Sequence, residues 1–205
     1  MKHSIFIIAL GMICALSTQA QAATQDEQRV AIQNMQVTVL NTLYHAQPSA
    51  RQEIKKAAGY AVFSSAGVAA IYFSGSYGHG LAHNNHNGDE TYMQMASAGV
   101  GLGLGVKDYR TVFIFKTSQA LNDFETTGLD LSGNLDLAAK QGVKGGAVGG
   151  AQDILPGVRV YQVTETGLLA QVMLEGTKYW RDSALNEYDE SSDAGSVLHS
   201  NNNQE

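Results

Sequence analysis

The sequence predicts an α+β fold: a small, glycine-rich, antiparallel β-barrel-like core with helices packed on its surface, mainly from the N-terminal side. Helical periodicity is found mainly at the beginning of the chain after residue 22, and about nine short β-rich runs follow it. This segregation of helices and strands is typical of α+β proteins rather than of alternating βαβ units. The chain also holds 22 glycines, which permit the strong strand coiling that a small barrel requires.

The first 22 residues have the three parts of an export signal. Lys2 lies at the start, a nearly unbroken apolar run covers Ile5–Leu16, and Ala20 and Ala22 stand at the A-x-A spacing of a signal-peptidase site. The apolar run is too short for a stable membrane-spanning helix, and no later segment reaches about 18 uninterrupted apolar residues. We therefore predict a signal peptide over residues 1–22, cleavage after Ala22 and a periplasmic location.

Cys14 is the only cysteine, and it lies inside the predicted signal peptide. A lipoprotein signal requires a small residue directly before its cysteine, and Ile13 is large. Lipidation is therefore not predicted. The mature chain is expected to have no disulfide, no thiolate metal ligand and no cysteine nucleophile.

The charge balance excludes one class of partner. Residues 23–205 carry 12 Lys and Arg against 19 Asp and Glu, which gives a formal net charge of −7. Nucleic-acid binding is therefore not predicted, because contacts with phosphates need a basic surface. The same balance weakens a purely electrostatic attraction to anionic lipid.

Two helices are predicted at the start of the mature chain. In Asp26–Ala46, an apolar stripe of Ile32, Met35, Val39 and Leu43 recurs at helical spacing. A second, short helix is expected to begin after Pro48 and Ser49, with Gly59 as its C-cap.

Short β-rich runs follow, at Tyr60–Phe63, Val68–Phe73 and Thr91–Met95, with a polar loop over Ala82–Glu90. Glycine and apolar residues then alternate over Gly99–Val106, and this period of two predicts one continuous strand. Glycines on one face of it indicate a close packing neighbour or a sharp bend in a closed sheet.

The C-terminal half is predicted from Thr111 onward. A strand over Thr111–Phe115 is followed by a helix over Ser118–Thr127, with Ser118 as N-cap and Gly128 beyond its end. Later elements are a weak strand at Leu129–Leu137, a flexible glycine-rich stretch at Lys140–Gly150, a hairpin of Val158–Val163 and Leu168–Leu174, and a disordered acidic tail at 189–205.

Six motifs occur together in the order and at the separations of a known family: Ala58–Phe63 (AGYAVF), Thr91–Met95 (TYMQM), Val100–Asp108 (VGLGLGVKD), Lys144–Gly146 (KGG), Val160–Gln162 (VYQ) and Gly176–Trp180 (GTKYW). Over roughly residues 30 to 188 the sequence resembles the SYLF domain family, with the bacterial, exported branch as the best match. We place the SYLF-like domain at residues 23–188. The resemblance implies a β-barrel-like core with surface helices, and binding to phospholipids or phosphoinositides through an N-terminal segment and basic residues.

Candidate lipid contacts combine basic and aromatic side chains, a composition suited to a bilayer interface. Two groups qualify: Arg51, Lys55 and Lys56 on the second helix, and Lys178, Tyr179, Trp180 and Arg181 near the end of the domain. The predicted function is a non-enzymatic module that binds phospholipid or a membrane surface of the bacterial cell envelope. The alternative is a periplasmic protein-interaction or structural module that binds another envelope protein and no lipid.

Other chemistries are not supported by the sequence. His79, His83 and His86, followed by Asp89, contain metal-ligand residue types, but the nearby glycines favour a solvated loop over a metal site. The glycine clusters lack the spacing of dinucleotide and P-loop motifs, and no Gly-x-Ser-x-Gly motif occurs. No catalytic residue, metal or cofactor is therefore predicted.

Overall fold

The computed structural model describes residues 23–70, 73–100, 105–131, 151–164, 167–168 and 176–187. The predicted signal peptide, the glycine-rich stretch at 140–150 and the acidic tail at 189–205 lie outside these residues. They remain predictions.

The first helix forms as expected, as α1 (Gln25–Ala46). It begins with a capping box, in which Glu27 N–H donates to Thr24 Oγ1 and Thr24 N–H donates to the Glu27 carboxylate at 2.8 Å. Two free N–H groups of the first turn are thus satisfied, and Asp26 and Glu27 also complement the helix dipole.

The second helix also forms, as α2 (Ala50–Lys56), but its predicted glycine cap is wrong. The helix ends at Ala57, which is extended. Gly59 is instead the first residue of a strand, where a Cβ would collide with the carbonyl oxygen of His83. Close approach of two strands, and not a helix end, therefore requires glycine at this position.

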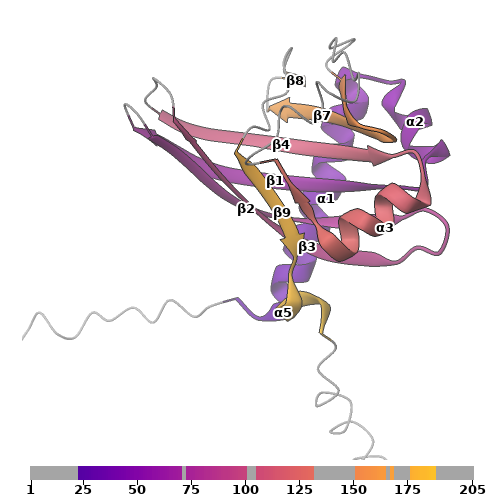
Figure 1. Ribbon diagram of the computed structural model, residues 1–205, viewed down its shortest axis with the longest axis horizontal. Coiled ribbons are helices and arrows are strands. Elements are labelled where there is room, and N and C mark those ends of the chain that lie inside the picture. Colours follow the sequence, from indigo (N-terminus) through magenta and orange to yellow (C-terminus); the bar gives the residue numbers. More distant parts are fainter. Residues whose placement is uncertain are drawn as a thin grey trace, which may run out of the picture.

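One antiparallel sheet forms the centre of the molecule (Figure 1), and its strand order is β5-β9-β3-β2-β1-β4-β7-β6, with β8 beside β7. The sheet curls without closing on itself within the described residues, which gives the barrel-like core that the sequence predicts. The strands are β1 (Gly59–Ala70), β2 (Phe73–Asn84), β3 (Glu90–Val100), β4 (Gly105–Phe115), β5 (Leu129–Asp130), β6 (Ala151–Leu155), β7 (Val158–Thr164), β8 (Gly167–Leu168) and β9 (Thr177–Arg181).

Strands in the first half are longer than the sequence suggested. The run at Tyr60–Phe63 continues to Ala70 as β1, so that Val68 belongs to the same strand. Gly78 and Gly80 do not interrupt β2, which pairs with β1 through both positions. Each glycine lies directly over a carbonyl oxygen of β1, so a side chain would not fit there. The polar loop shortens to a turn over residues 85–89.

The single strand predicted over Gly99–Val106 is wrong. β3 ends at Val100 and β4 begins at Gly105, and residues 101–104 lie outside the described part. The two strands run antiparallel and are separated in the sheet by β2 and β1. Glycine and apolar residues alternate at the end of β3 and at the start of β4. Residues 101–104 between them include no proline, asparagine or aspartate, which are the residue types that indicate a turn in a sequence.

Helix α3 (Ser118–Thr127) confirms the later helix, although its N-cap is Thr117 and not Ser118. Gly128 follows its end with a φ of 79°, a conformation that favours glycine. The pairs Val163–Leu168 and Thr164–Gly167 confirm that the two predicted strands pair as a hairpin. Residues 169–174 of the predicted second strand lie outside the described part. The strands β6 and β9 and the short helix α5 (Ser183–Asn186) were not predicted.

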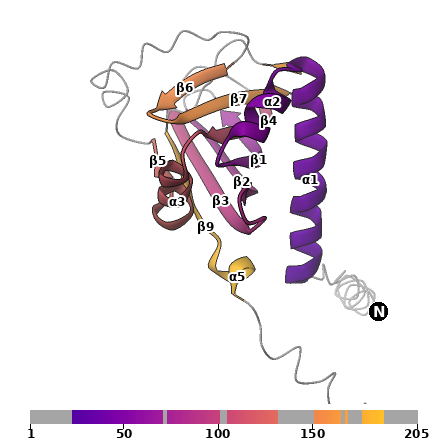
Figure 2. The same cartoon turned by 90° about the vertical axis from the view of Figure 1, so that its right-hand side faces the viewer.

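Two hydrophobic layers cover the two faces of the sheet (Figure 2). On the outer face, α1 and α2 pack on Val62, Val112 and Tyr161. On the inner face, α3 packs on a cluster of aromatic side chains from β1, β4 and β9. Burial of each large apolar side chain contributes about 1.5–3 kcal/mol, so both faces stabilise the curled sheet.

Candidate functional site

The three basic residues predicted on the second helix lie together on the surface of α2. Arg51, Lys55 and Lys56 are all exposed, and the Arg51 guanidinium lies 4.3 Å above the ring centre of Tyr44 on α1. The opposite side of α2 faces the sheet, where the Glu53 carboxylate lies 3.3 Å from Arg159 of β7. The three predicted basic side chains are therefore accessible on one short helix.

The second predicted group is divided between core and surface. Tyr179 is 1% exposed, and its ring centre lies 4.8 Å from that of Phe63 and 5.0 Å from that of Phe113. Trp180 is half-buried, while Lys178 and Arg181 are exposed. Tyr179 thus belongs to the inner core, and its neighbours on β9 are the surface residues.

These two groups do not form one surface. Helix α2 directly precedes the first residue of β1 and packs on the outer face near β7. Strand β9 pairs with β3, and β2 and then β1 lie beyond β3 in the sheet. The two groups are also apart in Figure 2. A single flat lipid contact through both groups is therefore not supported.

The apolar stripe of the first helix is part of the core. Ile32, Val39 and Leu43 are buried against the sheet, as in most amphipathic helices of globular proteins. In contrast, Val30 and Val37 are 54% and 57% exposed on the other side of α1. The stripe is thus not available to lipid while α1 stays in place.

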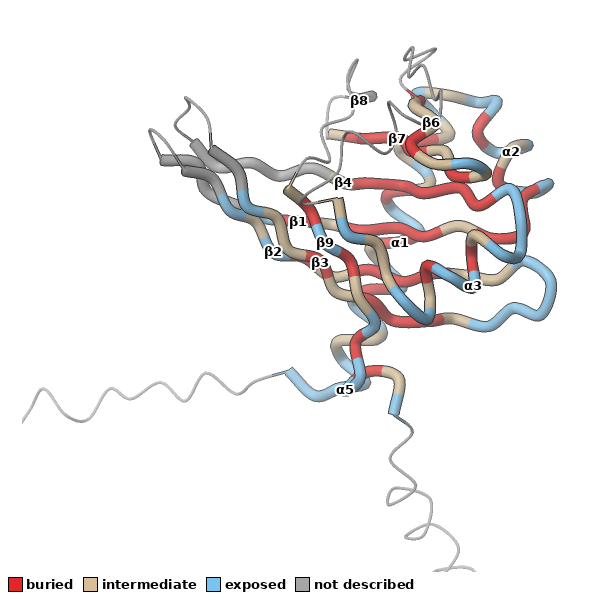
Figure 3. Tube along the Cα trace, in the orientation of Figure 1, coloured by how far each residue is buried: buried red, intermediate tan, exposed pale blue. Residues whose placement is uncertain are grey.

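Strand pairing brings together an uncharged region that is not among the predicted site residues. Residues 57–78 and 91–106 contain no Asp, Glu, Lys, Arg or His. In the sheet, these parts of β1, β2 and β3 lie side by side, and Figure 3 shows exposed segments along the three strands before the grey part begins. We call one face of this region the uncharged sheet end. It consists of Ala66, Gly75, Tyr77, Ala96 and Ala98.

All five residues share the outer face, the face on which α1 packs farther along the strands. Tyr77 pairs with Ala66 on one side and Ala96 on the other, and Gly75 pairs with Ala98. Directly opposed residues of adjacent strands point to the same face. Ala66, Gly75 and Ala98 are exposed, and Tyr77 is 47% exposed.

Lys178 and Trp180 border the uncharged sheet end. The pairs of Ala96 with Lys178 and of Gln94 with Trp180 extend the same face onto β9. Tyr77 and Lys178 therefore lie in one row, two strands apart, at a distance of about 10 Å between backbones. Lys178 Nζ also lies 3.6 Å from the exposed Asp130 carboxylate.

The position of Trp180 is fixed by contacts at the end of β9. Asp182, 4% exposed, accepts hydrogen bonds from Gln94 Nε2 at 2.7 Å and from Leu185 N–H at 3.1 Å. Asn186 Nδ2 donates to the Tyr92 carbonyl at 2.7 Å. These bonds tie the end of β9 and α5 to β3, so the part of β9 that carries Trp180 is anchored to the sheet.

The histidines are spread over β2 and the following turn. His79 and His83 lie on β2, and His86 is exposed in the turn. His79 packs edge-on against Tyr77 with ring centres 4.9 Å apart, and His83 Nδ1 lies 3.8 Å from Glu90. Among the described residues, no three His, Cys, Asp or Glu side chains are grouped so that they could bind a metal ion.

No helix in the described ranges combines the length and apolar character needed to cross a bilayer.

Burial raises the pKa of the Tyr77 phenol above its ordinary value, and the Asp182 charge adds to the effect. The phenol is therefore neutral at physiological pH.

Comparisons with known proteins agree with the resemblance seen in the sequence. A family model named Ysc84 and described as "Las17-binding protein actin regulator" matches residues 96–204. "Beta cell expansion factor A" of Aeromonas veronii is 34% identical over 172 residues, which cover 84% of this chain and 64% of that protein. The chain thus spans somewhat less than two thirds of this relative's length. The chain belongs to the Ysc84 family of SYLF-domain proteins.

Proposed function

We propose that this protein is a non-enzymatic module that docks reversibly on phospholipid surfaces of the bacterial cell envelope. The observation that carries the proposal is the uncharged sheet end, bordered on the same face by Trp180 and Lys178. Family membership supports a binding module that acts on lipid or on a partner protein.

The physical reason is the order of side-chain types along one face. Small apolar residues and the Tyr77 ring lose little when they leave water, because the phenol is neutral and none of the five residues is charged. Asp108 of β4 pairs with Ala66 and borders them on the side opposite Lys178. Tyr and Trp favour the level of the headgroups, and lysine reaches phosphate oxygens there. This order matches the depth profile of a bilayer from its apolar interior outward.

Docking through this surface leaves the basic residues of α2 away from the membrane. β1 is 12 residues long, and α2 precedes its start whereas Ala66 lies toward its end. At about 3.3 Å per residue, the α2 side chains are more than about 20 Å from the uncharged sheet end. Apolar transfer, and not attraction by α2, therefore contributes most of the binding energy.

The location is part of the same proposal. An export signal cleaved after Ala22 delivers residues 23–205 to the periplasm, where the available surfaces are phosphatidylethanolamine, phosphatidylglycerol and cardiolipin. The similar protein of Aeromonas veronii is also bacterial. The net charge of −7 on residues 23–205 makes the expected affinity modest.

Liposome co-sedimentation tests the function and the surface together. Residues 23–205 are mixed with vesicles of phosphatidylethanolamine, phosphatidylglycerol and cardiolipin at low and at moderate salt. We expect binding that Tyr77→Asp reduces strongly and that the triple variant Arg51→Gln, Lys55→Gln, Lys56→Gln leaves nearly unchanged. Tyr77 is exposed, so its substitution does not threaten the core, and circular dichroism verifies the fold of both variants.

Two results would contradict this proposal at different levels. If the wild-type chain stays in the supernatant at low salt, the lipid-binding function is wrong. If it binds but only the α2 variant releases it, the function stands and the assigned surface is wrong.

Protein interaction is the second candidate, because the description of the matched family names binding to a protein, Las17. In this alternative, the uncharged sheet end and its rim contact a protein of the envelope. Crosslinking in the periplasm that depends on Tyr77, together with an absence of vesicle binding, would favour it.

A further inference from the structure

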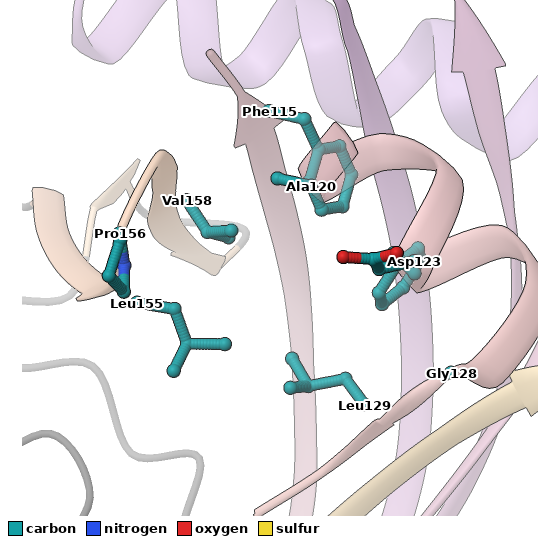
Figure 4. A pocket seen from close by; sticks show the side chains of 9 residues that line it. Phe115, Ala120, Asp123, Gly128, Leu129, Leu155, Pro156 and Val158 are labelled. Atoms are coloured by element: carbon teal, nitrogen blue, oxygen red, sulfur yellow. The ribbon is translucent and has the colours of Figure 1, made fainter. Parts of the chain in front are cut away.

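A cavity lies on the inner side of the sheet, away from the uncharged sheet end (Figure 4). Its volume is about 230 Å³. Helix α3 forms one wall, and the end of β4, the end of β6 with the turn after it, the start of β7 and the start of β5 form the others. The lining is Phe115, Ala120, Asp123, Phe124, Gly128, Leu129, Leu155, Pro156 and Val158.

Most of this lining is apolar and well anchored. Phe115, Phe124 and Val158 are at most 5% exposed and belong to the inner core. Leu129 and Leu155 are partly buried and pack against the same core. The cavity therefore has a firm floor and a partly open mouth, and an apolar group that enters it leaves water without displacing the core.

One charged side chain, Asp123, lines the cavity. In Figure 4 its carboxylate projects from α3 toward the space beside Leu155. Asp123 is exposed, and its Oδ1 accepts a hydrogen bond from Gln119 Nε2 at 2.7 Å. This amide is neutral, and no described Lys or Arg forms an ion pair with the carboxylate. Lys116 precedes the same helix, but its ammonium lies 3.2 Å from Asp153. The mouth of the cavity thus has a negative charge beside apolar walls.

We propose that this cavity binds small apolar amines: a ring or short alkyl group inserts between Phe115, Leu129 and Leu155, and its protonated nitrogen meets Asp123. A cavity of about 150 Å³ is large enough for benzene, so this larger cavity accommodates a phenyl ring with a short side chain. The carboxylate favours a cation and disfavours an acid of the same size.

This site is independent of the proposed membrane contact. Phe115 pairs with Gly59, the first residue of β1, whereas Ala66 lies toward the other end of β1 and pairs with Tyr77 of β2. The cavity opens by the inner side of the sheet, and the uncharged sheet end lies on its outer side. Ligand binding and vesicle binding can therefore succeed or fail separately.

Three ligands with nearly the same apolar body separate the contributions of shape and charge: 2-phenylethylamine, 2-phenylethanol and 3-phenylpropanoate. Each is titrated into residues 23–205 without lipid, and methyl NMR signals of Ala120, Leu129, Leu155 and Val158 report binding. We expect the amine to bind about three- to fivefold more tightly than the alcohol, as for a partly exposed ion pair. The acid should bind most weakly.

Two variants test the roles of charge and volume. Asp123→Asn keeps an oxygen for Gln119 and should make the affinities of amine and alcohol equal, whereas Asp89→Asn, which removes a distant exposed carboxylate, should preserve the preference. Ala120→Leu should fill the cavity and weaken all three ligands. The proposal is overturned if the three ligands bind alike to the wild-type chain, if none gives saturable shifts, or if Asp123→Asn retains the preference for the amine.

Discussion

Arg159 and Asp153 form a two-pronged ion pair across the hairpin of β6 and β7. Arg159 Nε lies 2.9 Å from Asp153 Oδ1, and Arg159 Nη2 lies 3.1 Å from Oδ2. The same guanidinium reaches Glu53 of α2, at 3.3 Å from Nη1. One arginine thus joins an edge hairpin to the helix that carries the predicted basic residues.

This ion pair predicts an acid-dependent loss of stability. Hydrogen bonds from Arg159 hold the pKa of Asp153 below its ordinary value, and Lys116 acts in the same direction. A lowered carboxyl pKa stabilises the fold at neutral pH, and this contribution disappears as the pH falls from about 4 through the folded-state value. Because both side chains are about one-third exposed or more, we expect only about 0.5 kcal/mol.

Urea unfolding of Asp153→Asn and of the wild-type chain at pH 7 and below pH 3 measures this contribution. The variant should be less stable at pH 7, and the difference should shrink in acid. Asp123→Asn is the matched control, since its carboxylate contacts an amide and not a guanidinium. An equal difference between wild type and Asp153→Asn at both pH values would show that the ion pair is not its cause.

Tyr179 and Trp180 are adjacent in the chain and should respond in opposite ways to substitution. Tyr179 is packed between the rings of Phe63 and Phe113, and Tyr179→Ala should destabilise the fold by about 3–5 kcal/mol, as for other large aromatic residues in cores. Trp180 is half-buried, so Trp180→Ala should cost clearly less.

Thermal unfolding and vesicle binding together separate the two residues. Trp180→Ala should weaken vesicle binding while most of its thermal stability remains. Tyr179→Phe is the control for Tyr179→Ala, because it keeps the ring and its contacts. If Tyr179→Ala unfolds at the same temperature as the wild type, the inner aromatic core is incorrectly assigned.

The glycines of β2 provide a third prediction, because they differ in the space around them. A Cβ on Gly80 would collide with the Val62 carbonyl oxygen, whereas a Cβ on Gly75 would lie 3.7 Å from its nearest neighbour, the Ser97 carbonyl oxygen. Gly80→Ala should therefore destabilise the fold by about 2 kcal/mol or more, and Gly75→Ala should stay within about 0.5 kcal/mol.

Chemical denaturation of the two alanine variants tests this difference directly. The comparison is matched, because both positions lie in the same strand and both variants gain one methyl group. Comparable stability of the two variants would argue against the close contact of β1 and β2 at Gly80.

Sequence patterns predicted elements wherever a local signal determined the structure. Helical spacing located α1, and glycine after Thr127 located the end of α3. β6 and β9 were missed because each is only five residues long. β9 also depends on β3, which is far away in the chain, whereas β6 pairs with the neighbouring β7. The alternation over Gly99–Val106 was misassigned to one strand because a period of two persists on both sides of a reversal.

The candidate site was predicted only in part, for the same physical reason. Composition alone identified Lys178 and Trp180, but only strand register places them beside Tyr77. Register also separates them from Arg51, Lys55 and Lys56, which composition had grouped with them. The sequence does contain one signal for this surface, since residues 57–78 and 91–106 carry no charge. Long uncharged runs indicate a candidate lipid contact as well as basic residues do.

The row formed by Tyr77, Ala96 and Lys178 leads to a prediction about salt. If apolar transfer dominates binding, Tyr77→Ser should weaken vesicle binding by a similar factor at about 0.05 M and at about 0.5 M salt. Salt in this range screens the attraction between charges but hardly changes the free energy of burying apolar side chains. Lys178→Gln should weaken binding only at the lower concentration. Lys116→Gln is a suitable control, because it removes an exposed lysine that is paired with Asp153 and lies near the opposite end of the sheet. Co-sedimentation of the four proteins at both concentrations measures these effects. If wild-type binding instead disappears at the higher concentration, attraction by cations dominates, and the uncharged sheet end is not the principal contact.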